Sequence, residues 1–276
     1  MLLLGVFVVM LTLAVTLVAS RDARAASLTL DDVDAGWSNA VGASPTITTN
    51  TDFTVARWGT EDDNSCVSAS ALATHFLGGS SDDRSGYIFD SDDTGRTFND
   101  GEVISLGAFT HVNCPITGSS IDSIDLGLTL DFSAPASESL TLPFTFSHWE
   151  TPNNPQSGTC ANGGANNSGV NANGCADRVQ VSGTPSDEFK VGDDLYKLQF
   201  VGFANSSDAY ATACPTPGST SPSLEFWTVE GQLNFACLYA KIIYSPAGHR
   251  GHQDPRRRDR ACRHRRGIHH PGEEQR

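Results

Sequence analysis

Apolar residues alternate with polar or small residues along much of the chain. Between 124 and 132 every second residue is isoleucine, leucine or phenylalanine, and 140–148 repeats the pattern with a histidine at its end. A period of two places alternate side chains on opposite faces of a β-strand, so each run predicts one buried and one exposed face. Shorter strands are expected at 53–58, 87–89, 103–112, 179–181, 196–200 and 224–229.

Clusters of Gly, Asn, Asp, Ser and Pro separate these runs and predict turns. Many short strands joined by turns indicate an all-β fold, a two-sheet antiparallel sandwich of jelly-roll-like type. Residues 235–244 are apolar or small on both faces apart from Lys241, as in a central strand. Residues 67–77 give a weak helical pattern, and 151–174 form the longest irregular segment, typical of a functional or flexible loop.

The chain divides into three parts by composition. Residues 1–25 combine an apolar run with Ala23-Arg24-Ala25, which predicts a signal peptide cleaved before Ala26. No Lys or Arg follows Met1, so an uncleaved membrane anchor is the alternative. Residues 26–246 are expected to form the β-sandwich, secreted or displayed at the cell surface. No later segment is apolar enough to span a membrane.

Residues 247–276 differ from the rest of the chain and predict a disordered basic tail. From Gly248 onward there are nine Arg, five of the eight His, and no strand or helix periodicity. One interpretation is out-of-frame translation after a single-base frameshift near Ala247, since a shifted frame can encode Val-Thr-Lys-Thr-Pro-Asp-Ala-Ala-Thr. The alternative is a genuine basic or metal-binding tail.

Charge limits the partners of the sandwich. Residues 26–247 carry seven basic and 27 acidic side chains, a net charge of −20. Such acidity repels phosphates and anionic lipids, which argues against nucleic acid and leaves the signal segment or a lost anchor as the only membrane attachment. Divalent cations, or the neutral glycans of a cell envelope or matrix, are compatible partners. Acidity that only maintains solubility is the alternative.

Six cysteines precede the tail, and no Cys-x-x-Cys motif occurs. An even number in an exported chain predicts disulfides and not a metal thiolate site. We expect Cys160–Cys175, because this bond would close an Asn/Gly-rich loop and stabilise it by about 3 kcal/mol. Cys214–Cys237 and Cys66–Cys114 follow by elimination.

Residues 90–95, Asp-Ser-Asp-Asp-Thr-Gly, resemble the start of an EF-hand loop. Asp90, Asp92 and Asp93 are therefore candidate Ca²⁺ ligands. The match then fails, because Gly101 stands where the bidentate Glu is required and the flanking residues predict strands. A solvated acidic turn is the alternative.

A series of short motifs follows one another in a characteristic order. They are Arg57-Trp58-Gly59, Ser85-Gly86-Tyr87, Gly107 to Asn113, Glu150-Thr151-Pro152-Asn153, Gly174 to Val179, and Glu230 to Asn234. In this order the chain resembles the choice-of-anchor K domain, a group that includes the THxN-type surface proteins, over residues 28–245. The resemblance implies an exported β domain joined to a cell-surface anchor, with no established activity. The chain departs from it by an Asp/Ser-rich insertion after Gly59 and by lacking a C-terminal sorting signal.

The Thr-His-x-Asn motif, Thr110, His111 and Asn113, lies on a predicted strand. His111 and Asn113 share one face of that strand and Thr110 the other. The two polar side chains are candidate ligands for a metal or a sugar. The alternative is a half-buried pair that satisfies backbone groups at a strand end.

Glu150, Asn153 and Asp177 supply oxygen atoms from neighbouring loops, and His148 shares a strand face with Glu150. β-Sandwiches commonly hold Ca²⁺ with such loop oxygens, so these three are a second candidate Ca²⁺ site. The alternative is a capped turn with a surface pair between Asp177 and Arg178.

No motif predicts a catalytic residue. The nucleophile elbow Gly-x-Ser-x-Gly, the zinc motif His-Glu-x-x-His and the phosphate loop are all absent. We therefore expect a non-catalytic surface module for adhesion, matrix or glycan binding. A carbohydrate-active hydrolase, which would need two facing carboxylates in a cleft, and a ligand-free spacer remain alternatives.

Overall fold

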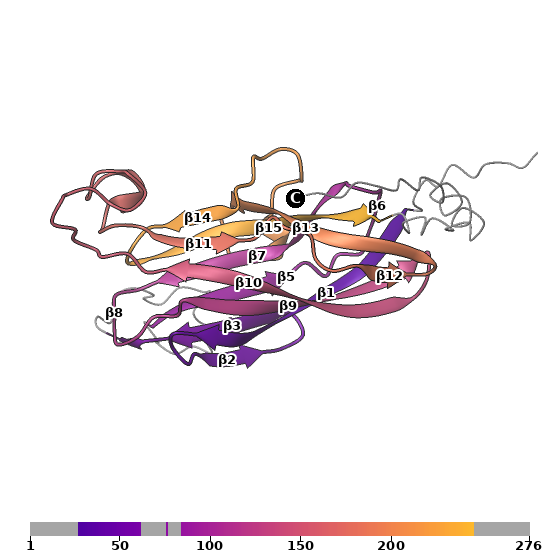
Figure 1. Ribbon diagram of the computed structural model, residues 1–276, viewed down its shortest axis with the longest axis horizontal. Helices are drawn as coiled ribbons and strands as arrows, with labels where there is room; N and C mark the ends of the chain where they lie inside the picture. The colour runs from indigo at the N-terminus through magenta and orange to yellow at the C-terminus, as the bar shows by residue number, and fades with distance from the viewer. Residues whose placement is uncertain (1–26, 62–75, 77–83, 246–276) are drawn as a thin grey trace, which may run out of the picture.

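A computed structural model describes residues 27–61, 76 and 84–245. They form two curled antiparallel sheets packed face to face in an elongated sandwich (Figure 1). The six-stranded sheet has the order β14 (Glu225–Thr228), β11 (Asp177–Val181), β10 (Glu138–Trp149), β9 (Ser123–Ala134), β1 (Leu28–Val41) and β6 (Arg96–Phe98). The predicted all-β sandwich is thus confirmed.

The seven-stranded sheet faces it. Its order is β12 (Phe189–Val191), β13 (Asp194–Asn205), β15 (Gln232–Tyr244), β7 (Val103–Asn113), β5 (Ser85–Ser91), β3 (Phe53–Trp58) and β2 (Thr46–Thr49). β4 (Thr60–Glu61) pairs with β8 (Ile116–Thr117), and η1 (Gly169–Asn171) and η2 (Ala211–Ala213) are short 3-10 turns. The chain crosses repeatedly between the two sheets, as in a jelly roll.

The period-two pattern accounts for the core between the sheets. On β9 the five predicted apolar residues from 124 to 132 are buried while the residues between them are partly exposed. On β10 the alternation is also kept, but burial is complete only at Phe146 and His148. Both strands therefore present to the other sheet the face that their sequences predict.

β7 is buried on both faces for almost its whole length, and β15 is buried on both faces from Ala236 to Ala240. The outer side of the seven-stranded sheet carries two further apolar clusters, one around Val112 and Ala209 and one around Tyr239. The segment between β13 and β14 covers this side and is joined to β15 by the Cys214–Cys237 disulfide. This cover explains why residues 235–244 are apolar on both faces.

Two of the expected disulfides are present, Cys160–Cys175 and Cys214–Cys237. Cys114 is also disulfide-bonded, and its predicted partner Cys66 lies outside the described residues. The predicted signal peptide, the predicted tail and, apart from Phe76, the weak helix at 67–77 lie outside them too. No described helix has the length and apolar character to cross a membrane.

The first strand, β1, was not predicted. Its buried residues are Leu28 and Leu30, then Val33, Ala35 and Trp37, so the buried set changes from even to odd numbers. The pairing with β9 shifts between Leu30 and Asp32, which identifies a β-bulge. A bulge inserts one residue and reverses the alternation, and this conceals the strand from a period-two analysis.

Candidate functional site

The Thr-His-x-Asn residues lie at the end of β7 and connect the two sheets. His111 and Asn113 are fully buried and both contact Thr228 on β14 of the opposite sheet. His111 Nδ1 is 2.8 Å from Thr228 Oγ1, and Asn113 Nδ2 donates to the same oxygen at 3.3 Å and to the Thr228 carbonyl at 3.4 Å. Thr110 is buried on the other face. His111 and Asn113 are therefore more completely buried than the half-buried pair considered from the sequence.

Thr228 Oγ1 connects His111 to the start of β11. It donates to the Asp177 carbonyl at 3.3 Å, and in this arrangement it accepts from His111 Nδ1. Burial, followed by His148 and Arg57, holds the pKa of His111 well below its usual value. His111 is thus neutral, and its Nε2 atom is buried without a hydrogen-bond partner in the described part of the chain.

His148, at the end of β10, lies between a tyrosine and a carboxylate. Tyr87 Oη is 2.6 Å from its Nδ1, and Glu150 Oε2 is 3.3 Å from its Nε2. Burial raises the pKa of Tyr87 well above its usual value, so the phenol keeps its proton. The indole of Trp58 packs against both His148 and His111 at 5.5 and 6.2 Å between ring centroids. The imidazole of His148 is therefore fixed in position.

Asp177 begins β11 and is completely buried. Its Oδ1 accepts from the Thr151 amide at 2.7 Å, whereas Oδ2 has no hydrogen-bond partner among the described residues. Burial, followed by the charge of Glu150, raises the pKa of Asp177 to about 8, and hydrogen bonds from the Thr151 amide and the Asn113 side chain oppose the rise. The surface pair with Arg178 considered from sequence is wrong, because alternation points Arg178 outward, where it pairs with Glu225 at 3.2 Å.

Glu230 lies close to Asp177 and Glu150 and was not predicted as a site residue. It lies in the turn between β14 and β15 and is 4% exposed, and its Oε2 has no partner in the described structure. Burial, then Glu150, raises the pKa of Glu230 to about 7, and hydrogen bonds from Asn153 and Asn113 oppose the rise. Its position in the motif Glu230 to Asn234 was the only sequence signal, and no function was predicted for that motif.

The long loop 150–176 projects from one end of the sandwich and positions two of these carboxylates (Figure 1). Cys160–Cys175 closes it, and Asn162 and Asn171 form a reciprocal amide pair at 3.0 and 3.1 Å. Thr151 Oγ1 donates to the Ala176 carbonyl at 3.0 Å, which joins the two ends of the loop. Glu150 and Asp177 are therefore brought together by the loop that separates them in sequence.

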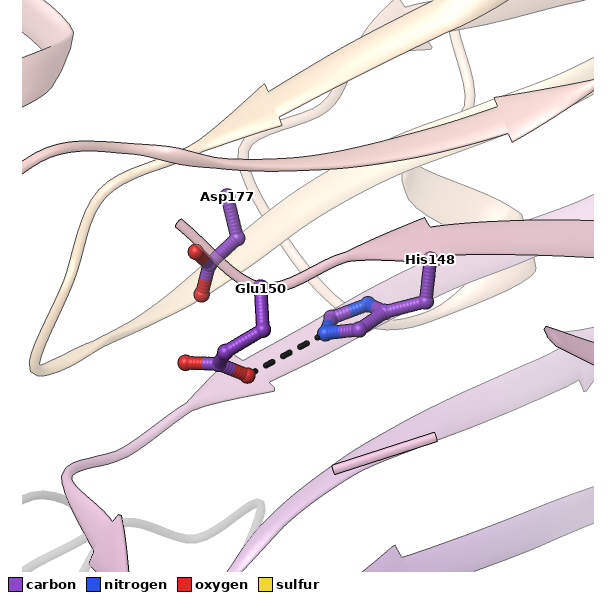
Figure 2. Close-up of side chains that lie close together, drawn as sticks. All are labelled: His148, Glu150 and Asp177. Carbon is purple, nitrogen blue, oxygen red and sulfur yellow. Dashed lines mark hydrogen bonds and ion pairs between the residues drawn. The ribbon is translucent and has the colours of Figure 1, made fainter. Parts of the chain in front are cut away.

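His148, Glu150 and Asp177 each offer one ligand atom, and these atoms lie within 4.8 Å of one another (Figure 2). Two of the three predicted loop ligands, Glu150 and Asp177, are thus adjacent. Asn153 is exposed, and its side chain hydrogen-bonds to Glu230. The geometry adds His148, a nitrogen donor that changes the type of ion such a site would select.

The EF-hand-like aspartates are held differently. Asp92 Oδ1 accepts from the Thr94 amide at 3.2 Å, and Asp92 Oδ2 pairs with Arg96 at 2.7 Å. Asp90 Oδ2 accepts from the Ala211 amide at 2.6 Å, and Asp93 is exposed. These contacts are those of a hydrogen-bonded acidic turn.

The outer face of the six-stranded sheet carries a second feature that sequence analysis missed. Trp149, Arg178 and Trp227 are directly opposite one another on β10, β11 and the edge strand β14. The Arg178 guanidinium carbon lies 4.8 Å from the Trp149 ring centroid and 5.8 Å from that of Trp227. We call these three residues the Trp–Arg–Trp ladder. It arises only from strand register, which the sequence does not reveal.

No protein-family model and no curated protein sequence matches the chain. The group His148, Glu150 and Asp177, which we call the buried cluster, and the Trp–Arg–Trp ladder are therefore interpreted from their own chemistry.

Proposed function

We propose that the chain is an extracellular or cell-surface binding module whose Trp–Arg–Trp ladder binds a neutral glycan. The observation that carries the proposal is the in-register ladder, in which Trp149 is 43% exposed on an open sheet face. Trp149 does not stand alone, because its ring centroid lies 6.4 Å from that of Trp227, and a contiguous exposed aromatic patch is typical of a recognition surface. The two described disulfides support an oxidising, extracellular location.

The surroundings of the ladder favour a sugar. Indole faces pack against the C–H groups of sugars, while charged and amide groups bond to their hydroxyls. Arg178 and Glu225 supply such groups at the ladder. A hollow of about 400 Å³ beside β14 adds polar lining from Asn205, Thr220 and Ser223. The net charge of −20 over residues 26–247 disfavours anionic polysaccharides.

The motif resemblance supports the same class of function. The residues that carry it, among them His111, Asn113, Glu150 and Asp177, meet in one cluster beneath the ladder strands. A surface display domain of the choice-of-anchor type is the family assignment that we propose on this basis.

The test is binding of the full chain to a panel of neutral oligosaccharides derived from glucan, mannan, galactan and chitin, followed by calorimetry on the best binder. Trp149→Ala is expected to weaken binding at least about tenfold, equivalent to about 1.4 kcal/mol. Ile47→Ala is the matched control, since Ile47 is a similarly exposed apolar residue at 40% on β2 of the other sheet.

Binding that is equal in wild type and Trp149→Ala would contradict the ladder as the site. Absence of binding to the whole panel would favour the ligand-free spacer. Release of new reducing ends from a bound oligosaccharide would favour a hydrolase, with the buried carboxylates as its first candidates.

A further inference from the structure

The buried cluster beneath the ladder has the composition of a metal centre. Its three members come from the end of β10, the residue after it and the first residue of β11. Figure 2 shows the carboxylates of Glu150 and Asp177 close together, with the His148 imidazole facing Glu150. Zinc lies about 2.0–2.2 Å from nitrogen and oxygen ligands, so two ligands at corners of a tetrahedron are about 3.4 Å apart. His148 Nε2 and Glu150 Oε2 already have this spacing at 3.3 Å. All three ligand atoms lie within 4.8 Å of one another, so binding has to draw the remaining atoms together by at most about 1.4 Å.

A second observation distinguishes this cluster from a chance gathering of charges. The Asp177 side chain is completely buried, yet its Oδ2 has no hydrogen-bond partner among the described residues. Glu230 Oε2, beside the cluster, also has no hydrogen-bond partner among the described residues. Buried polar atoms almost always have partners, and an unsatisfied carboxylate oxygen is among the costliest exceptions. A bound cation would satisfy such an oxygen.

The neighbours of His148 suit a metal ligand. A histidine that ligates through Nε2 typically donates its Nδ1 proton to an oxygen that orients the ring. Tyr87 Oη lies 2.6 Å from Nδ1, where its oxygen can accept that proton, and Trp58 packs on the ring. Glu150, with 38% of its side chain exposed, leaves the cluster open to solvent on one side. Water could therefore complete the coordination shell.

We propose that His148, Glu150 and Asp177 bind a single divalent transition-metal ion of the Zn²⁺ type. The imidazole nitrogen decides the class, because Ca²⁺ takes oxygen ligands whereas Zn²⁺ combines histidine with carboxylates. This replaces the all-oxygen calcium site that the sequence indicated at Glu150, Asn153 and Asp177. The ion binds at the ends of the loop 150–176 and fixes them to each other. The proposal does not depend on glycan binding.

The test uses the full chain, freed of metal with EDTA and then titrated with ZnCl₂ or CaCl₂. Zinc is expected to bind and to raise the thermal unfolding midpoint, since a ligand of the native state alone stabilises it. Glu150→Gln keeps the size of a half-exposed side chain and removes its charge. This substitution is expected to weaken zinc binding at least about tenfold, as measured by the zinc concentration needed to raise the midpoint.

Glu188→Gln is the matched control, because Glu188 has 45% side-chain exposure, close to the 38% of Glu150, and lies outside both the cluster and the ladder. It should bind zinc as the wild type does. The five histidines after residue 248 are common to all three proteins, so differences between variants report the proposed site alone. Three outcomes would overturn the proposal: no zinc-dependent rise in the wild type, an equal rise in Glu150→Gln, or a larger rise with calcium than with zinc.

Discussion

Two clusters of three ionisable residues can be compared within this one molecule. His148, Glu150 and Asp177 lie at the end of the sandwich, and Asp32, Asp34 and Asp131 lie on the outer face of the six-stranded sheet. In both, one ligand atom from each residue falls within 4.8 Å of the others. By proximity alone the two clusters are equivalent.

Their surroundings differ. The three aspartates are partly exposed, and Asp32 Oδ1 accepts from the Val33 amide at 2.9 Å. Burial, followed by the charges of Asp32 and Asp131, raises the pKa of Asp34. Water can solvate these charges, so they do not require an ion. The buried cluster combines a nitrogen donor with an unsatisfied carboxylate oxygen, and that combination distinguishes a candidate metal centre from an acidic surface.

The largest expected effect comes from opening the loop that joins the ends of the buried cluster. The double substitution Cys160→Ser/Cys175→Ser removes a closure of 15 residues. It should lower the free energy of unfolding by about 3 kcal/mol in the chain-entropy account. Zinc affinity should fall with it, because Glu150 and Asp177 are held together by this loop. Urea unfolding and zinc titration of the same variant measure both effects.

The exposed cluster of Asp32, Asp34 and Asp131 is built from β1 and β9 and shares no residue with the loop. Opening the loop should therefore leave the arrangement of these three aspartates unchanged. A variant with wild-type stability and wild-type zinc affinity would show that the loop does not position the buried cluster.

The smallest expected effect comes from the exposed cluster itself. Asp34→Asn removes one of three mutually repelling carboxylates and should stabilise the fold by a few tenths of a kcal/mol. The gain should disappear in about 1 M NaCl, where the Debye length is about 3 Å. Chemical unfolding at low and high salt measures it. A loss of stability above about 1 kcal/mol, or a loss of zinc binding, would remove the distinction between the two clusters.

The fold was largely predictable because most strands keep strict alternation. β3 has the predicted boundaries, and β9 buries the predicted face. β1 escaped prediction since its bulge changes the parity of the buried residues. The pairing Cys160–Cys175 was predictable because an Asn/Gly-rich loop has few other means of closure.

The candidate site was predictable only in part. Glu150 and Asp177 were identified through their motifs. His148 was placed on the same strand face as Glu150 but was not predicted as a ligand. Thr228 and Glu230 were missed, because their relation to His111 and Asp177 depends on how the two sheets pack. The Trp–Arg–Trp ladder was missed for a similar reason: its three residues are adjacent only through the register of β10, β11 and β14.

The most direct measurement is anomalous diffraction at the zinc absorption edge from crystals of the full chain grown with zinc. The account predicts a strong peak bonded to His148 Nε2 and to carboxylate oxygens of Glu150 and Asp177, and none at Asp32, Asp34 and Asp131. A zinc-bound crystal with no peak at the buried cluster, or with its peak at the three aspartates, would contradict it.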